Sequence, residues 1–329
     1  MKGAKLLLPV YRLELPTPYS VGTVNSYLIY TPPFTLIDPG PDIPLARKTL
    51  NEKLLNLGLS LSQINRVFIT HAHTDHCGLA QWVHELSGAK IYLHPYEWRK
   101  VTGGYDFFQE RLPFLLEMGM PDEVFLRLVN NKDILPPPYI TKDSLVEVTE
   151  GEDLSFNAGA FKIHHFPGHA PGHLCLYDPE EKSLLSGDFL LPHITPNPLL
   201  EPDPENKTRR SPSLRQYIEG LTRLEKMNLK KAWPGHGKVI ENVPELLRSF
   251  QEHHLNRFKA ILEVLSPDKK LNVYQMCQLI YPGLQGFEVF LGLSEIQAHL
   301  DVLVEKKQVI ARPQGTVFFY RKAQEKMAG

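Results

Sequence analysis

The sequence has few cysteines, no long apolar run and no excess of charge of either sign. Its three cysteines, Cys77, Cys175 and Cys277, lie far apart and form no C-x-x-C pair, so we expect them to be reduced, mostly buried and in a reducing compartment. The formal net charge is −1 at pH 7. Nothing global therefore attracts a polyanion, and any role with nucleic acid needs a local basic face.

The chain also lacks the signals of membrane insertion and export. No apolar stretch approaches the roughly 20 residues that span a bilayer. The apolar run within residues 1–9 stops at Pro9 and is shorter than the ~7–15 residues of a signal-peptide core. We therefore expect a cytoplasmic protein. With 329 residues, of which 42% are hydrophobic, the chain is long enough to form two domains.

The first part of the chain alternates short apolar strands with helices, which predicts an α/β layered domain. A hairpin is expected around Pro32-Pro33, and a buried strand over 66–70 delivers a histidine-rich segment. The other predicted elements up to residue 93 are a helix over 43–57, a helix over 78–86 and a strand over 90–93.

Residues 97–131 interrupt this alternation of strands and helices, because their composition is typical of helices and includes several Phe and Met residues. We interpret them as an ordinary packed helical insertion; the alternative is a cap whose aromatic and Met face lines a substrate channel. Residues 192–212 are rich in proline and polar residues and predict a long loop, which in a compact domain is usually functional or mobile.

After about Pro244 the pattern changes to helices of small-domain size. Helices are expected over 246–265, 273–280 and 294–306, the last beginning at a capping box formed by Ser294 and Gln297. A hairpin over 309–320 follows. Three helices and a hairpin predict a winged-helix-like module, so we divide the chain into an α/β domain over 1–245 and a winged-helix-like domain over 246–329.

A six-residue segment concentrates side chains that bind divalent metals. It reads His71-Ala72-His73-Thr74-Asp75-His76 and follows the predicted strand over 66–70. Imidazole nitrogen suits zinc, and carboxylate adds a hard anionic oxygen. Active sites of layered α/β proteins lie at the carboxyl ends of strands, so the segment predicts a metal site there. The alternative is a solvated histidine-rich loop.

Three later segments argue against that alternative, because each places a ligand residue after a strand and a Gly or Pro. The ligand candidates in these segments are His169, Asp188 and His236. Glycine at such a point lets the backbone approach a metal without a side-chain clash.

The motifs H-x-H-x-D-H, G-H-x-P-G-H, S-G-D and P-G-H-G, in this order, resemble the metallo-β-lactamase superfamily, which includes the glyoxalase II thioesterases. Residues 25–28 and 36–40 are similar to the opening strands of that family, so the resemblance covers about residues 10 to 245. It implies a four-layer αββα metallo-β-lactamase sandwich, here with a C-terminal winged-helix-like domain. It also implies two metal ions, held by His71, His73 and His169, by Asp75, His76 and His236, and by a bridging Asp188. His173, in the same motif, is expected to support the ligands.

Two divalent metal ions, zinc first and iron or manganese as alternatives, would share a water and bring its pKa toward neutrality, so that hydroxide could attack a substrate. Asp75 would ligate one metal and orient the nucleophile. His193 lies five residues after Asp188, and we expect it either to contact substrate or an oxyanion, or to be plain loop structure. Cys77 and the other histidines are expected to be packing or surface residues.

The leading functional hypothesis is hydrolysis of an ester, thioester or lactone. The basic residues and helical C-terminal domain by which glyoxalase II binds glutathione cannot be matched here. The alternative is a metal-dependent endoribonuclease or phosphodiesterase, because a winged-helix-like module after this domain is similar to β-lactamase-like protein 2. The helix over 294–306 carries Glu295, Asp301 and Glu305, however, where a reading helix needs basic residues. We expect a small acyl substrate rather than nucleic acid, and the module to pack on the catalytic domain or on a second subunit of a homodimer.

Overall fold

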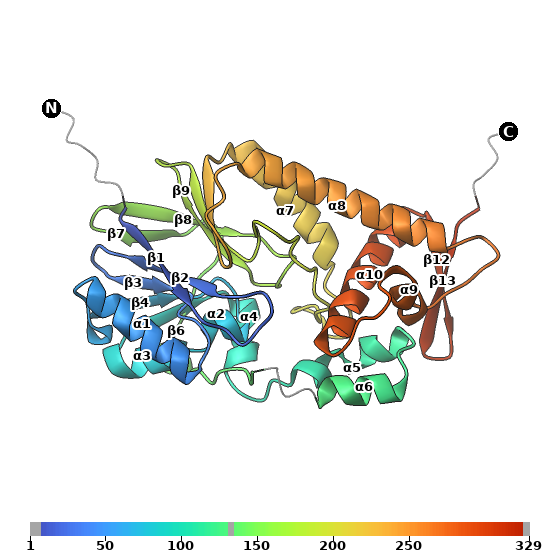
Figure 1. The fold of residues 1–329 in the computed structure, drawn as a ribbon, viewed down its shortest axis with the longest axis horizontal. Coiled ribbons are helices and arrows are strands. Elements are labelled where there is room, and N and C mark those ends of the chain that lie inside the picture. Colours follow the sequence, from blue (N-terminus) through green and yellow to red (C-terminus); the bar gives the residue numbers. More distant parts are fainter. Residues whose placement is uncertain (1–7, 131–134, 325–329) are drawn as a thin grey trace. The chain divides into compact units, whose positions relative to one another are not determined.

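The computed structural model describes residues 8–130 and 135–324. Most of the apolar run near the start and the last residue of the predicted insertion lie outside these ranges. The chain divides into two compact units (Figure 1). The first comprises residues 1–105, 133–196 and 222–246, and the second comprises residues 106–132, 197–221 and 247–329.

The first unit contains a six-stranded mixed sheet in the order β1-β2-β3-β4-β5-β6. β1 to β3 pair antiparallel, whereas β3 to β6 pair parallel. The strands are β1 (Val10–Leu15), β2 (Val24–Ile29), β3 (Thr35–Ile37), β4 (Arg66–Phe68), β5 (Lys90–Leu93) and β6 (Leu145–Glu147). The hairpin expected around Pro32-Pro33 is confirmed as β2 and β3.

A second sheet of five strands has the order β11-β10-β9-β8-β7 and is antiparallel except for the parallel pair β10 and β11. Its strands are β7 (Asp153–Phe156), β8 (Gly159–His165), β9 (Leu174–Asp178), β10 (Ser183–Gly187) and β11 (Lys231–Pro234).

The two sheets pack face to face through a shared apolar core, in which Tyr27 and Phe68 of the first sheet join Phe161 and Leu176 of the second. Helices α1 (Pro44–Asn56) and α3 (Ala80–Ser87) cover the other face of the first sheet, where Leu50 packs in a second core. β2 is therefore buried along its whole length. Each fully buried Leu or Phe contributes roughly 1.5–3 kcal/mol. The predicted α/β layering is confirmed.

This architecture gathers the ends of strands that lie far apart in the sequence. The carboxyl ends of the parallel strands β3, β4 and β5 meet at one edge of the first sheet. The short helices α2 (Thr74–Cys77) and α4 (Pro95–Val101) begin just past β4 and β5. In the second sheet, β10 and β11 are parallel and also end together.

The second unit is mainly helical. It contains α5 (Phe107–Glu117), α6 (Asp122–Val129), α9 (Val273–Ile280), α10 (Phe287–Glu305) and the hairpin of β12 (Val309–Gln314) and β13 (Val317–Lys322). Two helices, α7 (Ser213–Met227) and α8 (Val243–Val264), contribute residues to both units. The predicted order of three helices and a hairpin is confirmed, and its assignment to the winged-helix class stays a prediction.

The predicted start of the third helix at Ser294 is wrong, because α10 begins at Phe287. Ser294 lies within the helix, and its hydroxyl donates to the Phe290 carbonyl one turn earlier instead of capping a helix end. Gln297 contacts Asp301 and Tyr320. The capping-box pattern misled here because both residues satisfy their hydrogen bonds inside the helix.

Residues 106–130 and residues 197–212 of the proline-rich loop belong to this second unit. Arg111 of α5 is fully buried, donates to the Leu200 carbonyl and pairs with Glu201 at 2.6 Å. Phe107 of α5 packs against Phe290 of α10 at a centroid distance of 5.1 Å. The insertion therefore uses a polar anchor and aromatic side chains to pack within its own unit.

Candidate metal centre

The structure brings together all seven residues that the sequence analysis assigned to the metals. They converge in two buried groups linked through a third. His71 and His73 follow β4, Asp75 and His76 lie in α2, and the other three lie in loops that follow strands of the second sheet. These three are His169 after β8, Asp188 after β10 and His236 after β11.

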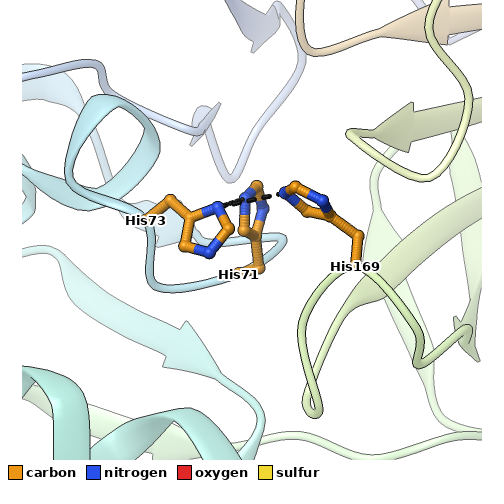
Figure 2. Close-up of side chains that lie close together, drawn as sticks. All are labelled: His71, His73 and His169. Atoms are coloured by element: carbon orange, nitrogen blue, oxygen red, sulfur yellow. Dashed lines mark hydrogen bonds between the residues drawn. The ribbon is translucent and has the colours of Figure 1, made fainter. Parts of the chain in front are cut away.

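Three imidazole nitrogens meet in the first group (Figure 2). Nε2 of His71 lies 2.8 Å from Nδ1 of His73, and Nε2 of His169 lies 3.1 Å from the same atom. Two nitrogens bound at 2.0–2.1 Å to one tetrahedral zinc would lie about 3.4 Å apart, so the three atoms are close to the spacing of a common cation.

The second group contains Asp75, His76 and His236. Nε2 of His236 lies 3.3 Å from Oδ2 of Asp75, and Nε2 of His76 lies 3.9 Å from it. Asp188 stands between the groups: its Oδ1 is 3.3 Å from Nε2 of His76, and its Oδ2 is 3.8 Å from Nε2 of His169. This placement is the one that a bridging carboxylate needs.

The side-chain atoms that face the centre are arranged to bind a cation and do not form well-aligned hydrogen bonds with one another. Nε2 of His76, Nε2 of His236 and Oδ1 of Asp188 are buried, and none has an aligned hydrogen bond among the described residues. Nε2 of His76 is nonetheless only 3.3 Å from Oδ1 of Asp188, and Nε2 of His236 is only 3.3 Å from Oδ2 of Asp75. They therefore point at common positions between the side chains. Buried polar atoms left in this way are costly unless a further partner satisfies them.

Residues outside the ligand set decide which nitrogen of His71 and of His76 faces the centre. The Thr70 hydroxyl donates to Oδ2 of Asp38, so it must accept from Nδ1 of His71 at 3.0 Å. Nδ1 of His76 donates to the same carboxylate oxygen at 2.9 Å. Both rings thus carry their proton on Nδ1 and turn the lone pair of Nε2 inward, as ligands that bind a metal must.

His236 is oriented in the same way by backbone atoms. Its Nδ1 donates to the Thr23 carbonyl at 2.8 Å, which leaves Nε2 to face the carboxylates. Asn25 holds the loop that carries His236, because its amide donates to the carbonyls of Pro234 and Gly237. The loop after β11 is therefore fixed to the loop before β2 and to β2 itself.

Glu97 ties together the two loops that carry the three-histidine group. This side chain on α4 is fully buried. Its Oε2 accepts from the amide of Ala72, between His71 and His73, and its Oε1 accepts from the amide of Gly172 in the His169 loop, at 3.2 and 2.8 Å. Lys100, one helical turn away, pairs with it at 3.0 Å. One carboxylate thus fixes both loops.

The charges of the site divide the histidines into two kinds. Burial lowers the pKa of His71 and of His73, so both rings are neutral. Burial opposes charge on His76 and His236 too, but the surrounding carboxylates, Asp188 foremost, raise the pKa of each. The acidic side of the centre therefore attracts positive charge, either as protons or as metal, and metal binding would displace those protons.

His173 lies beside the candidate ligands, but its Nε2 accepts a hydrogen bond from the backbone. That atom accepts from the backbone amide of Asp188 at 3.1 Å, which helps to position the Asp188 carboxylate. Gly235 allows the close approach of the last loop: a Cβ there would lie 2.7 Å from Cε1 of His76 and would also meet Oδ1 of Asp188. Only glycine fits at this contact.

His193 is exposed and lies outside the metal groups, near Gly237 of the His236 loop. Its catalytic role stays a prediction.

Cys77 is fully buried and burial raises the pKa of its thiol, which fits packing rather than reactivity. The sequence analysis did not assign Thr70 or Glu97 to the site, and it mentioned Asp38 only within residues 36–40, which are similar to an opening strand of the family.

Comparison with known proteins supports the same interpretation. Residues 19–236 match the model of the metallo-beta-lactamase superfamily. The chain is 30% identical over 326 residues to the probable metallo-hydrolase YqjP of Bacillus subtilis (strain 168), covering 95% of this chain and 97% of the relative. It is 24% identical to a beta-lactamase-like protein 2 homolog of Caenorhabditis elegans, covering 92% and 85%. The crystal structure of a metallo-beta-lactamase family protein from Thermus thermophilus is similar with a TM-score of 0.80 and 27% identity, covering 95% and 98%.

Proposed function

The chain belongs to the metallo-β-lactamase superfamily and is a hydrolase, and from this premise we propose that it cleaves an ester, thioester or lactone with the help of two divalent metal ions. Zinc is the cation that the donor set suits first, because imidazole nitrogens predominate and carboxylate oxygens complete it. Iron and manganese are the alternatives.

The observation that carries the proposal is the convergence of buried atoms that lack aligned partners. His71, His73 and His169 would hold one cation. Asp75, His76 and His236 would hold the second, and Asp188 would contact both. Metal ions bound in this way lower the pKa of water and polarise a carbonyl oxygen.

The side chains of the chain itself position the reaction and handle its protons. Burial would raise the pKa of Asp75, but His76 and His236 more than offset this and lower it, so the carboxylate is ionised at pH 7. Its side chain is 12% exposed, the largest value among the groups around the second cation. An ionised and accessible carboxylate can accept a hydrogen bond from an attacking water and hold its proton.

Asp38 and Thr70 keep the rings of His71 and His76 in the ligating tautomer throughout. Glu97 holds the two loops of the three-histidine group at a fixed separation. Preorganisation of this kind lowers the cost of reaching the reactive geometry, because the groups need not move when charge develops on the substrate.

Cleavage of phosphodiesters, including RNA, is the second candidate, and the match to a beta-lactamase-like protein 2 homolog over 92% of the chain favours it. Charge argues against it. The chain has a formal net charge of −1. On α10, Asp301 already pairs with Arg210, and Glu295 is buried. A surface for a polyanion would need free basic groups.

One panel assay separates these possibilities. Protein stripped of metal and reloaded with zinc, iron or manganese would be offered thioesters, lactones, aryl esters, single-stranded RNA, a phosphodiester and a β-lactam, with Asp188→Ala prepared in parallel. We expect metal-dependent turnover of an ester, a thioester or a lactone, and we expect Asp188→Ala to lack it. Turnover of RNA or phosphodiester alone, with all carbonyl substrates intact, would replace the proposal with the second candidate.

A further inference from the structure

A second group of potential metal ligands lies in the helical unit and shares no residue with the group assigned to hydrolysis. His253 and His254 of α8 and Glu295 of α10 each offer a ligand atom, and these atoms lie within 4.8 Å of one another. The rings of His253 and His254 meet edge to face at a centroid distance of 5.3 Å. Nε2 of His253 lies 3.4 Å from Oε1 of Glu295.

Hydrogen bonds fix the tautomers of the buried rings in this group. Nδ1 of His299 donates to the Glu295 carbonyl at 2.7 Å, so its Nε2 carries a lone pair. That atom must accept from Nδ1 of His254, 3.1 Å away. His254 is therefore left with a lone pair on Nε2.

This lone pair is the feature that needs an explanation. His254 is 3% exposed, and its Nε2 has no hydrogen-bond partner among the described residues. An acceptor buried without a partner costs free energy that folded proteins seldom leave uncompensated. A neutral imidazole with one nitrogen held by a hydrogen bond and the other bare is the state in which histidine binds metal.

We infer that His253, His254 and Glu295 bind one divalent cation of the zinc class, distinct from the hydrolytic pair, and that this cation joins α8 to α10. Two imidazole nitrogens and one carboxylate oxygen form a donor set that zinc and its neighbours accept. The side chain of His253 is 37% exposed, so a cation can enter from solvent and keep a water as a further ligand.

Arg257, one turn after His253 on α8, competes with this cation. Its Nε is 3.8 Å from Oε1 of Glu295 and has no hydrogen bond of its own among the described residues. The guanidinium instead lies over the ring of Tyr281, 4.3 Å from its centroid. Arg257 thus neutralises part of the carboxylate charge without satisfying it, and removal of this charge should strengthen cation binding.

The test counts metal ions on the full chain. Stripped protein would be titrated with zinc and, separately, cobalt, and bound metal would be measured after gel filtration, with the Kd obtained by competition with a chromophoric chelator. The parent should bind one more ion per chain than Glu295→Gln and than His253→Ala. Arg257→Gln should keep that ion and bind it at least roughly tenfold more tightly, since a nearby positive charge is lost.

His253→Ala guards the test against a folding artefact, because its side chain is the exposed member of the group. Far-ultraviolet circular dichroism in chelator would verify that each variant is folded. An equal metal count in the parent, Glu295→Gln and His253→Ala would overturn the inference, as would weaker binding in Arg257→Gln. Loss of the hydrolytic ions is measured independently in Asp188→Ala, so the two proposals fail separately.

Discussion

The chain contains two groups built from the same residue types, histidines and a buried carboxylate, yet they differ in how their atoms are satisfied. Around Asp188, non-ligand groups such as Asp38 and the Thr23 carbonyl hold the outer ring nitrogens of His76 and His236, and the inner nitrogens converge. Around Glu295, His254 and His299 bond to each other. Among the described histidines of that group, Nε2 of His254 is the one buried ring nitrogen without a hydrogen-bond partner.

The difference shows what makes a histidine cluster a strong metal site. Histidines in proximity can simply exchange hydrogen bonds, as His299 and His254 do. In the group around Asp188, residues outside the ligand set hold the rings of His71, His76 and His236, so that their Nε2 lone pairs face inward. This support, more than the number of histidines, distinguishes the proposed hydrolytic centre from the group on α8 and α10.

Replacement of Asp188 is the strongest test of this contrast, because this residue contacts both groups of the proposed hydrolytic centre. We expect Asp188→Ala to lose at least about 10⁴-fold in kcat/KM, the scale seen when a member of the reacting unit is removed. Metal content should fall with it. Asp153→Ala, on the exposed side of β7, is the matched control and should behave like the parent. Full activity with two bound ions in Asp188→Ala would exclude the bridging role.

A substitution of Asp38 tests whether residues outside the ligand set orient the histidine rings. Asparagine tolerates the left-handed backbone found there, at φ 49°, so Asp38→Asn should fold normally. Its amide group, however, would place a donor against Nδ1–H of His76 and disturb the tautomer. We expect cation affinity to fall roughly 10–100-fold, as for other groups that orient metal ligands. Competition with a chelator measures this loss.

The control for Asp38→Asn is Asp42→Asn, four residues along the chain. Asp42 forms an exposed ion pair with Arg47 and contacts no metal ligand in the described structure. An exposed pair of this kind contributes roughly 0–1 kcal/mol, so neither stability nor metal affinity should change much. Equal affinity in the two variants would mean that Asp38 does not orient His76.

The comparison also shows which features a sequence can predict. The segment from His71 to His76 is visible because its ligands are adjacent in the chain, and the alternation of strands predicts where it lies. The role of Glu97 cannot be predicted from the sequence, because its partners are backbone amides 25 and 75 residues away. Every residue other than proline has such an amide, so the residue type of the partner gives no signal. Glu295 is hidden for a similar reason, since its partner His253 is 42 residues distant. The prediction of where α10 begins was wrong, because we gave a local capping pattern more weight than the apolar residues that precede it.

Glu97 allows a finer test of how loops are held around the three histidines. Glutamine can accept only one of the two amide bonds that Glu97 accepts. We expect Glu97→Gln to weaken the three-histidine cation about tenfold, in the lower range for groups that support ligands. Lys100→Met is the matched control, because it removes the charge paired with Glu97 but leaves both amide bonds. If both variants bind metal equally, the amide bonds do not position the loops.

The smallest expected effect concerns His94. Like His254 and His299 of the second unit, it contacts another histidine, although it lies near the loops that carry the candidate metal ligands. Its ring stacks on His165 at a centroid distance of 4.4 Å, and its Nδ1 accepts from the amide of Tyr96 to cap α4, the helix that carries Glu97. Burial, with a smaller contribution from His165, lowers the pKa of His94 to about 4. Protonation would also break the cap, because Nδ1 would have to take up the proton.

The sign of the pH effect follows from this shift. Above pH 6.5 the ring is neutral in both the folded and unfolded chain; as pH falls from about 6.5 toward 4, only the unfolded chain takes up the proton, so stability is lost. We expect His94→Asn, which can still cap α4 but does not titrate, to reduce the loss of unfolding free energy between pH 7 and pH 5 by roughly 1 kcal/mol. Urea unfolding in chelator at both pH values measures the difference. Parallel pH profiles for parent and variant would show that His94 is protonated as readily in the folded chain as in the unfolded one, and hence that its burial does not keep it neutral.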